Sequence, residues 1–347
     1  MKIKKILSIA LAALIICIPI SHSFASSTVN SDSGMVSLSV SQSAVTIKHN
    51  GASAFLDVIA KFKDGSTKNV NELAEWKSKN QDIAIAYDGR ILAMGKGITN
   101  VTVSYKGFTQ EIKVKVTEYK DLEAVLNSQI LAQSLTESER DAIINKASAM
   151  YNTTWVPTQN LTGWRGNYTY YAGNTYRIPY SQTAYQKDDI GFNQALGYGD
   201  FYSYYVRYYM QDGTGRVFDN QSDADATGKP YETIRMPKYG NDCSAFVSFA
   251  FGVSRNTTWS FLSGIKNGTF AMVGSYNVDN PTYDNLISSY QQMQRGDAIT
   301  NTGHAILIGA NYSDWCICYE QTPYQITITT YDHTQLANNS YRPFAKK

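Results

Sequence analysis

The sequence has few charged residues and no cluster of basic ones. Lys, Arg, Asp and Glu make up 17% of the 347 residues, and the formal net charge is +2. Three of the lysines lie in the first 25 residues, which leaves 28 basic and 29 acidic side chains in the rest of the chain. Nucleic-acid binding relies on a basic surface that neutralises phosphates. The composition therefore argues against a nucleic-acid partner.

After residue 20 the sequence also lacks apolar runs long enough to span a bilayer. Residues 6–20 form an apolar stretch that follows three lysines and is interrupted by Pro19. A spanning helix needs about 20 apolar residues, which argues against a membrane anchor. The residues before Cys17 lack the small side chains of a lipoprotein signal. We therefore expect residues 1–25 to be a signal peptide, cleaved after Ala25, and the protein to be secreted, either released or associated with the cell wall, and not transmembrane.

Common cofactor and metal motifs are missing as well. The sequence contains no phosphate-binding loop, no dinucleotide-binding glycine pattern and no zinc spacing. A stretch from Asp223 begins like a calcium loop, but Ile234 occupies the position where such a loop needs a bidentate glutamate. We expect neither a cofactor nor a metal ion.

Cysteine is scarce, and this makes the few thiols informative. Beyond the predicted signal peptide the chain has Cys243, Cys316 and Cys318, an odd number, so an exported protein keeps at least one unpaired thiol. Cys316 and Cys318 alternate in an apolar run and would point to one face of a strand, where they make poor disulfide partners. We interpret them as strand packing, with a metal pair as the less favoured alternative. Cys243 then requires an explanation.

Residues 36–118 consist of short runs in which apolar and polar side chains alternate. Turn-forming pairs separate the runs at Asn50-Gly51, Asp64-Gly65, Asp88-Gly89 and Lys106-Gly107. A period of two with frequent turns predicts an all-β antiparallel sandwich, preceded by a flexible lead-in over residues 26–35. No cysteine lies in this segment, so we expect it to be dispensable for any chemistry based on a thiol.

The details of this segment resemble the bacterial immunoglobulin-like repeat of secreted and surface proteins. The residues that carry the resemblance are Trp76-x-Ser78-x-Asn80-x-x-Ile83-Ala84, Gly89-Arg90-Ile91-x-Ala93 and Gly95-x-Gly97. It implies an immunoglobulin-like domain that serves as a spacer or binding module.

The pattern changes after residue 118. Residues 119–152 predict a helical linker, with a short amphipathic helix followed by a second helix opened by a capping box at Thr136 and Glu139. Residues 153–347 follow as one domain with a tyrosine-rich N-terminal extension: 14 of the 26 tyrosines lie between Tyr151 and Tyr231. These rings either pack a polar β-rich layer, which we favour, or form a polysaccharide-binding surface.

Cys243 lies where a helix is predicted to begin. Asn241 or Asp242 is the capping residue, apolar side chains recur at helical spacing from Phe246, and Gly252 ends the helix. The helix dipole and the free N–H groups of the first turn favour a thiolate. A thiolate nucleophile still needs a proton donor for its leaving group, and that donor is usually histidine.

His304 is the best candidate for that donor. His49 lies in the predicted sandwich and His333 in a polar loop, whereas His304 precedes the apolar strand 305–309 and can reach a helix N-terminus. A third group must orient the imidazole. The next strand offers Glu320 and Gln321, which point to opposite faces, and the sequence leaves open which of them faces His304.

The blocks around these residues resemble the NlpC-like, papain-like cysteine peptidases and amidases of bacterial cell walls. The matching residues are Asp242-Cys243-Ser244-x-Phe246-Val247, Gly296-Asp297 and Gly303-His304-Ala305-x-Leu307. The resemblance implies that Tyr231, in Gly228-x-Pro230-Tyr231, stabilises the oxyanion or positions substrate. Glu320 favours the related CHAP amidases, and Ala245 replaces a glycine common in the NlpC-like group.

Taken together, the sequence predicts an N-terminal all-β immunoglobulin-like sandwich followed by an α+β papain-like catalytic domain, in which a helix packs on an antiparallel sheet. The expected function is a secreted cysteine hydrolase that cleaves amide bonds in peptidoglycan stem peptides through a thioester, with a muropeptide as substrate. Two alternatives remain: a non-catalytic adhesin that binds wall polysaccharide through the sandwich or the tyrosine-rich segment, and an acyltransferase that uses the same Cys–His pair.

Overall fold

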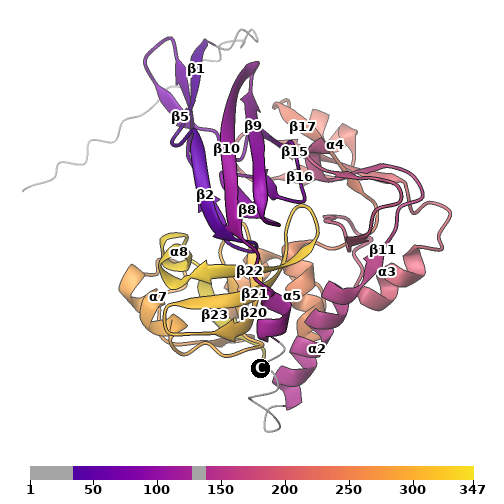
Figure 1. Ribbon diagram of the computed structural model, residues 1–347, viewed down its shortest axis with the longest axis vertical. Helices are drawn as coiled ribbons and strands as arrows, with labels where there is room; N and C mark the ends of the chain where they lie inside the picture. The colour runs from indigo at the N-terminus through magenta and orange to yellow at the C-terminus, as the bar shows by residue number, and fades with distance from the viewer. Residues whose placement is uncertain (1–33, 127–137) are drawn as a thin grey trace, which may run out of the picture.

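The computed structural model describes residues 34–126 and 138–347. The predicted signal peptide and the capping-box residue Thr136 lie outside these residues. Figure 1 shows a β-sandwich at the top of the molecule, a helix-covered sheet below it, and a layer of short helices and strands on the right. In the described part of the chain, no helix combines the length and hydropathy that crossing a membrane requires.

The sandwich is built from ten short strands. They are β1 (Met35–Val40), β2 (Ala44–His49), β3 (Ser53–Phe55), β4 (Val58–Phe62), β5 (Thr67–Asn69), β6 (Glu75–Ser78), β7 (Ala84–Tyr87), β8 (Arg90–Ala93), β9 (Gly97–Tyr105) and β10 (Phe108–Glu118). The sheets have the orders β1-β4-β5, β2-β10-β9-β6 and β3-β8-β7. Pairing is antiparallel except between β2 and β10, which run parallel. Alternate residues of β9 and β10 are buried around Trp76, as the period of two predicts.

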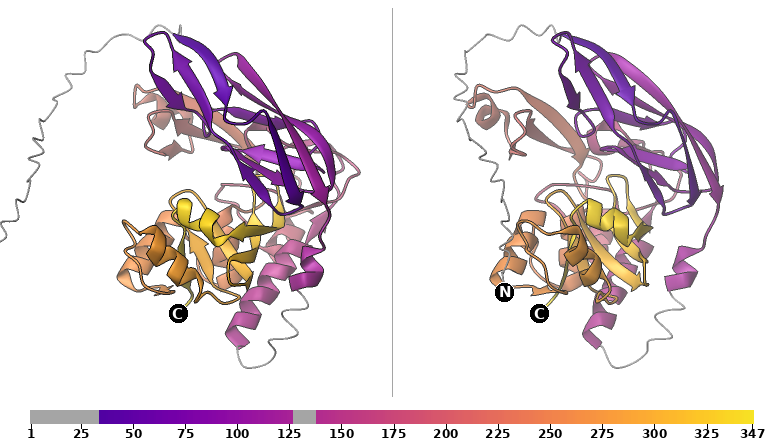
Figure 2. Two further views of the ribbon diagram at one scale, coloured as in Figure 1. Left: turned by 60° about the vertical axis from the view of Figure 1, so that its left-hand side comes forward. Right: turned by 90° about the vertical axis from the view of Figure 1, so that its left-hand side faces the viewer.

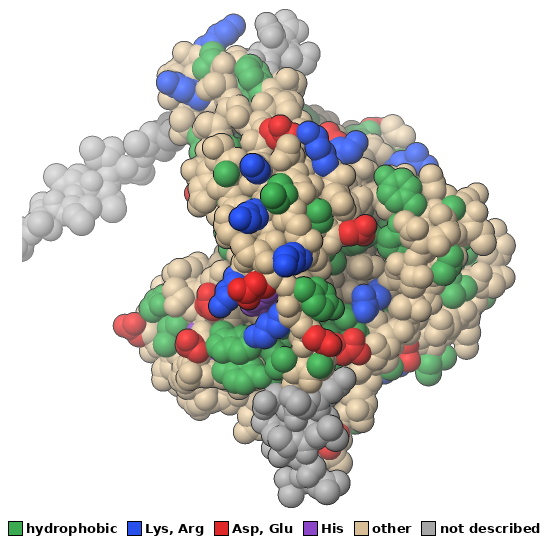
Figure 3. Space-filling view, viewed as in Figure 1, with side chains coloured by type: hydrophobic (Ala, Val, Ile, Leu, Met, Phe, Trp, Pro, Cys, Tyr) green, Lys and Arg blue, Asp and Glu red, His purple; other side chains and the backbone are tan. Residues whose placement is uncertain are grey.

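The hairpin β7–β8 attaches the sandwich to the rest of the molecule. Ala84, Ala86 and Ile91 pack in the sandwich core, whereas Ile85 and Leu92 belong to the core of the following domain. Both faces of this small sheet are therefore buried. On the face shown in Figure 3, side chains of both charges gather where the sandwich meets the lower half of the molecule.

The turn of this hairpin is formed by Asp88 and Gly89. Both have positive φ, 48° and 85°, which is the backbone of a two-residue hairpin turn. A Cβ on Gly89 would lie 2.7 Å from the carbonyl oxygen of Leu56, so only glycine fits. The turn fixes the first residue of β8, Arg90, at the junction between the domains.

The described part of the linker contains two helical segments. Residues 122–126 are helical, and the second predicted helix is α2 (Ser138–Asn152), which buries Ile143, Ile144, Ala147 and Met150. Helix α2 packs against the helix that begins at Cys243.

The tyrosine-rich segment forms a layer of short elements. They are β11 (Thr154–Trp155), β12 (Leu161–Thr162), η1 (Trp164–Gly166), β13 (Thr169–Tyr170), β14 (Tyr176–Arg177), α3 (Asp189–Ala195), β15 (Tyr204–Met210), β16 (Val217–Phe218), α4 (Gln221–Asp225) and β17 (Tyr231–Pro237). Many of the rings pack on one another, with Trp155 in contact with Tyr170, Tyr176 and Phe201. Asp223 lies in the short helix α4 and not in a calcium loop. Among the described residues, no group of His, Cys, Asp and Glu is arranged to hold a metal ion.

The remaining chain forms a six-stranded antiparallel sheet with helices against it (Figure 2). The elements are α5 (Cys243–Phe251), α6 (Thr258–Asn267), β18 (Ala271–Met272), α7 (Tyr283–Tyr290), β19 (Ala298–Thr300), β20 (Ala305–Asn311), β21 (Trp315–Gln321), β22 (Ile326–Asp332), α8 (His333–Asn338) and β23 (Arg342–Ala345). The strand order is β18-β23-β19-β20-β21-β22. Helix α5 packs on β20 and β21, which explains why both strands are almost continuously buried.

Candidate functional site

Cys243 occupies the first turn of α5. The cap is Asp242, whose carboxylate accepts hydrogen bonds from the Ala245 N–H at 2.7 Å and from the Ser244 hydroxyl at 2.9 Å. The first N–H groups of a helix have no acceptor within the helix, so they remain directed at whatever lies before it. Cys243 is 5% exposed, so the residue is almost entirely buried.

His304 faces the thiol from the start of β20. Asn301 fixes the backbone there, because its side-chain oxygen accepts from the His304 N–H at 2.8 Å. The Cys243 side chain lies close enough to the imidazole to act on its protonation. Its Nε2 lies 2.8 Å from Oε1 of Glu320, so Nδ1 is the nitrogen left for the thiol. The structure thus joins three sequence-predicted residues in a Cys–His–Glu chain of contacts.

The surroundings of His304 stabilise its protonated form. Burial by itself lowers the pKa of the imidazole, but the charges of Cys243 and Glu320 and the hydrogen bonds to both outweigh it and raise the pKa to about 10. The protonated form of His304 is therefore favoured across the neutral pH range.

Glu320 is the group that orients the imidazole, and it is fully buried. Its Oε1 contacts His304 and also accepts from Arg90 Nη1 at 2.5 Å. Its Oε2 accepts from the Tyr331 hydroxyl at 2.9 Å and from Arg90 Nη2 at 3.3 Å. Burial would raise the pKa of Glu320, but the Arg90 charge and the His304 contact hold it well below its usual value.

Gln321 points away from His304. Its amide donates to the carbonyl oxygen of Thr322 at 3.1 Å, and its own oxygen has no partner among the described residues. Successive residues of a strand face opposite sides, so only one of the two neighbours can reach the imidazole. The structure assigns that position to Glu320.

Tyr231 lies away from Cys243, which corrects the role that the family resemblance implied for it. Its hydroxyl donates to Asp225 at 2.6 Å and its ring packs against Tyr208, in the sheet of β15, β16 and β17. Tyr180, and not Tyr231, lies near the Cys243 thiol. The segment around Tyr180 pairs with Asn241, immediately before the capping residue, and the electrostatic field of Cys243 acts on its phenol.

The other histidines and thiols lie outside this arrangement. His333 is buried, with Nε2 2.9 Å from the side-chain oxygen of Asn311, and His49 contacts the carbonyl oxygen of Asn50. Cys316 and Cys318 are unpaired and fully buried on one face of β21. Burial raises the pKa of the Cys318 thiol well above its usual value, so this thiol is unreactive in the folded protein.

A cavity of about 350 Å³ lies between the sandwich and the sheet domain and opens onto His304. The sandwich contributes Phe55, Glu72, Tyr87, Asp88 and Arg90; the tyrosine-rich layer contributes Trp164, Arg165, Tyr180, Gln182 and Tyr209; the sheet domain contributes Asn301, Gly303, His304, Pro323, Tyr331, Gln335, Asn339 and Tyr341. The lining is polar and aromatic, with carboxylates on the sandwich wall and a guanidinium group on each of two walls, Arg90 on the sandwich wall and Arg165 on the wall of the tyrosine-rich layer.

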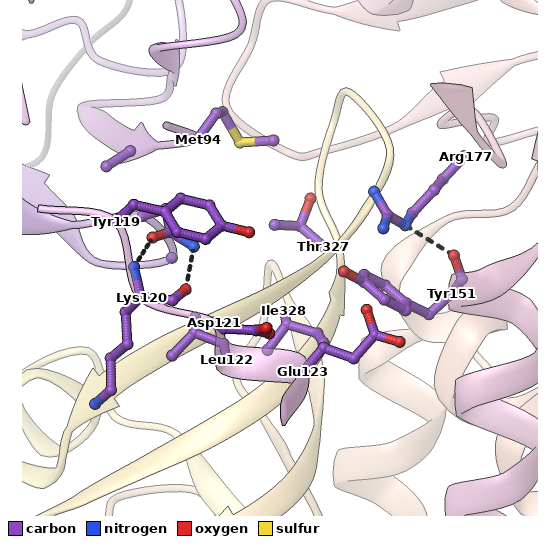
Figure 4. Close-up of a pocket in the computed structure, with 13 residues that line it drawn as sticks. Met94, Tyr119, Lys120, Asp121, Leu122, Glu123, Tyr151, Arg177, Thr327 and Ile328 are labelled. Carbon is purple, nitrogen blue, oxygen red and sulfur yellow. Dashed lines mark hydrogen bonds between the residues drawn. The ribbon is translucent and has the colours of Figure 1, made fainter. Parts of the chain in front are cut away.

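A second cavity, of about 180 Å³, lies where the linker crosses the domain junction (Figure 4). The guanidinium carbon of Arg177 lies 3.9 Å from the ring centroid of Tyr151, and Nε of Arg177 donates a hydrogen bond to the Tyr151 carbonyl oxygen. The lining includes Glu123 but no cysteine or histidine. This cavity therefore lacks a histidine such as His304, which lines the first one.

Sequence reasoning missed two residues of the site, Arg90 and Tyr180. Tyr180 is one of 14 tyrosines in its segment, and nothing in the sequence separates it from the others. Arg90 is the only arginine within residues 36–118, and it follows a predicted turn and precedes an apolar run. A lone arginine at the start of a buried strand was the available signal, because a buried guanidinium requires a partner.

Comparisons with known proteins do not identify the chain. No family model matches it, and no curated protein matches it. Among solved structures, domains 4 and 5 of the S-layer protein SbsC align with a TM-score of 0.22 and 15% identity, over 25% of this chain and 54% of that one. Domains 5 and 6 of the same protein align with a TM-score of 0.22 and 16% identity, over 25% and 45%. The chain thus spans about half the length of these structures, and the similarity carries no argument about function.

Proposed function

We propose that the protein is a secreted, papain-like cysteine hydrolase that cleaves amide bonds in peptidoglycan stem peptides. One observation carries the proposal: Cys243 at a helix N-terminus contacts His304, whose other ring nitrogen is held by the buried carboxylate of Glu320. Acyl transfer requires a nucleophile, a base beside it, and a third group that orients the base. An adhesin has no use for this arrangement.

Acylation begins when the Cys243 thiolate attacks the carbonyl carbon of the scissile amide. The carbonyl oxygen gains negative charge, and the free N–H groups at the start of α5 are positioned to stabilise it, with the Tyr180 hydroxyl as a further donor. The imidazolium of His304 then gives its proton to the leaving nitrogen. The C–N bond breaks, the amine departs, and the acyl group remains on sulfur as a thioester.

Deacylation uses the same groups in reverse. Neutral His304 takes a proton from a water molecule, whose oxygen attacks the thioester carbon. The C–S bond breaks, the carboxylic acid leaves with the second proton of the water, and Cys243 is left as a thiolate beside protonated His304. Glu320 keeps the ring in one orientation through both half-reactions. If an amine replaces the water, the same site performs acyl transfer.

The cavity is suited to a peptide that carries both charges. Glu72 and Asp88 line the wall supplied by the sandwich, and Arg165 lies on the wall supplied by the tyrosine-rich layer. Trp164 and Tyr209 add flat apolar surface. Stem peptides contain free carboxylates and amines along a short chain, and these features support them as the substrate class together with the family resemblance.

The test is digestion of purified peptidoglycan and of soluble muropeptides, followed by mass spectrometry of the fragments. A hydrolase produces fragments that gain one water at a single amide position. An acyltransferase produces fragments joined to a new amine. If neither product forms from any wall substrate while the protein remains folded and its Cys243 is reduced, the proposed function is wrong.

Glu320→Gln is expected to lower turnover at least about tenfold, the order of effect of a misoriented base. The amide cannot carry the charge that stabilises the imidazolium, and it turns a donor toward Arg90. Gln321→Met is the matched control, because it keeps the volume at the neighbouring position on the opposite face. We expect it to change turnover by less than about twofold, within the range of a residue outside the site. The reversed result would show that Gln321 orients His304.

A further inference from the structure

Arg90 reaches the candidate site from the sandwich, 230 residues away in sequence from Glu320. Only 5% of the residue is exposed. Its Nη1 and Nη2 bind the two oxygens of the carboxylate, Nη1 also donates to the Tyr87 hydroxyl at 2.7 Å, and Nε donates to the Ser53 hydroxyl at 2.8 Å. The guanidinium carbon lies 4.8 Å from the ring centroid of Tyr331. Every nitrogen of the guanidinium group therefore has a hydrogen-bond acceptor.

The sandwich holds this side chain in one place. The turn at Asp88 and Gly89 fixes the start of β8, and Ile85 and Leu92 anchor the hairpin in the core of the neighbouring domain. Ser53 belongs to β3, the strand beside β8. Arg90 is thus part of a rigid element, and the same element contributes Phe55 and Tyr87 to the cavity wall.

The carboxylate of Glu320 needs such a partner. An ionised carboxylate with no exposed surface is unfavourable unless opposite charge and hydrogen bonds compensate. His304 alone supplies one contact and carries charge only while it is protonated. Arg90 is charged at every pH at which the protein is folded. Its two hydrogen bonds to the carboxylate keep Oε1 directed at the imidazole.

We propose that Arg90 is a positioning residue of the active site, supplied by the sandwich, which keeps Glu320 ionised and aimed at His304. The inference rests on the proposed function. It also corrects the expectation that the sandwich is dispensable for the chemistry, because the triad's third member is held by a residue of that domain. The enzyme is competent only when the two domains are docked.

The titratable groups around Glu320 define how pH affects its contacts with Arg90 and His304. They are Arg90 on β8, Tyr87 on β7, His304 before β20, Cys318 on β21, Tyr331 on β22 and Tyr341 before β23. Of these, Arg90 and His304 lower the pKa of Glu320. Without Arg90 that pKa rises, so the carboxylate takes up a proton at higher pH and the acid limb of activity moves upward.

The experiment is a double-mutant cycle with Arg90→Met and Glu320→Gln. We expect Arg90→Met to lower kcat by about tenfold or more with little change in KM, and to shift the acid limb upward. In the Glu320→Gln background the same substitution should add less than about twofold, because Arg90 acts through Glu320. Additive losses, or a loss confined to KM, would overturn the inference.

Stability is controlled within the same set of variants. Arg90→Met leaves a buried charge unpaired and destabilises the fold, whereas the double variant removes both charges and is expected to recover thermal stability. If Arg90→Met does not fold, Arg90→Lys takes its place in the cycle: it retains charge, loses the two-point contact, and should show an intermediate loss of kcat. Lys79→Gln is the control for charge on the sandwich, because Lys79 forms a surface pair with Glu111 and should leave kcat unchanged.

A second readout is independent of any wall substrate. Iodoacetamide alkylation of Cys243, followed by peptide mass spectrometry against pH, reports the thiolate–imidazolium pair directly. We expect Arg90→Met, or Arg90→Lys in its place, to move the acid limb of the alkylation rate upward. If muropeptides are not cut but this shift occurs, the proposed function fails and the role of Arg90 stands. If a folded Arg90 variant is alkylated like the wild type, the role of Arg90 fails.

Discussion

Cys243→Ala is expected to abolish cleavage of muropeptides, with turnover reduced by at least about 10⁴-fold. The other thiols of the described residues, Cys316 and Cys318, cannot replace the nucleophile, because both are fully buried in β21. The side chain itself contributes little to the fold: it lies in the first turn of α5, and the cap bonds of Asp242 do not involve its sulfur. The measurement is fragment release from one soluble muropeptide by wild type and variant at equal concentration.

Cys316→Ala is the matched control for loss of a thiol. It removes a buried side chain from β21, so we expect a lower melting temperature with unchanged turnover at a temperature where the variant is folded. Wild-type rates of fragment release in Cys243→Ala would contradict the mechanism. Circular dichroism and thermal melts of all three proteins separate a lost nucleophile from a lost fold.

His304→Gln is expected to reduce turnover by at least about 10³-fold, because both the stabiliser of the thiolate and the donor to the leaving amine are removed. Glutamine can accept or donate a hydrogen bond but cannot carry the proton. His333→Gln is the control. Its ring is buried and contacts Asn311, outside the site, so it is expected to affect stability and not turnover. Equal losses of turnover in the two variants would show that His304 is not the proton donor of the site.

The pH dependence of the wild type should also report the ionisation of His304. The proton that the leaving group needs is lost as pH rises through the pKa of His304, about 10, so we expect the basic limb of kcat/KM near that pH and not near 6.5. His304 also makes the folding stability depend on pH. Its folded-state pKa lies above the unfolded value, so its contribution is complete below about pH 6.5 and is lost between there and about pH 10.

The sequence determined those features that depend on neighbouring residues along the chain. Asp242 before an apolar run predicts a capped helix with Cys243 in its first turn, and the structure contains that helix. The alternation in residues 36–118 predicts strands, and the turn pairs Asp88-Gly89 and Lys106-Gly107 adopt the positive φ values that hairpins need. These are local properties of backbone and side chain, so they can be inferred without knowledge of the fold.

Tertiary structure decided which side chains share the site. Glu320 and Gln321 are neighbours with similar shape, and only the packing of β21 against β20 shows which of them faces His304. Tyr180 reaches Cys243 because its segment pairs with Asn241, and Tyr231 does not because β17 carries it toward Asp225. Arg90 reaches Glu320 because one hairpin is buried between two cores. Such contacts depend on how segments that are distant in sequence pack together, and this packing cannot be inferred from the spacing of residues along the chain.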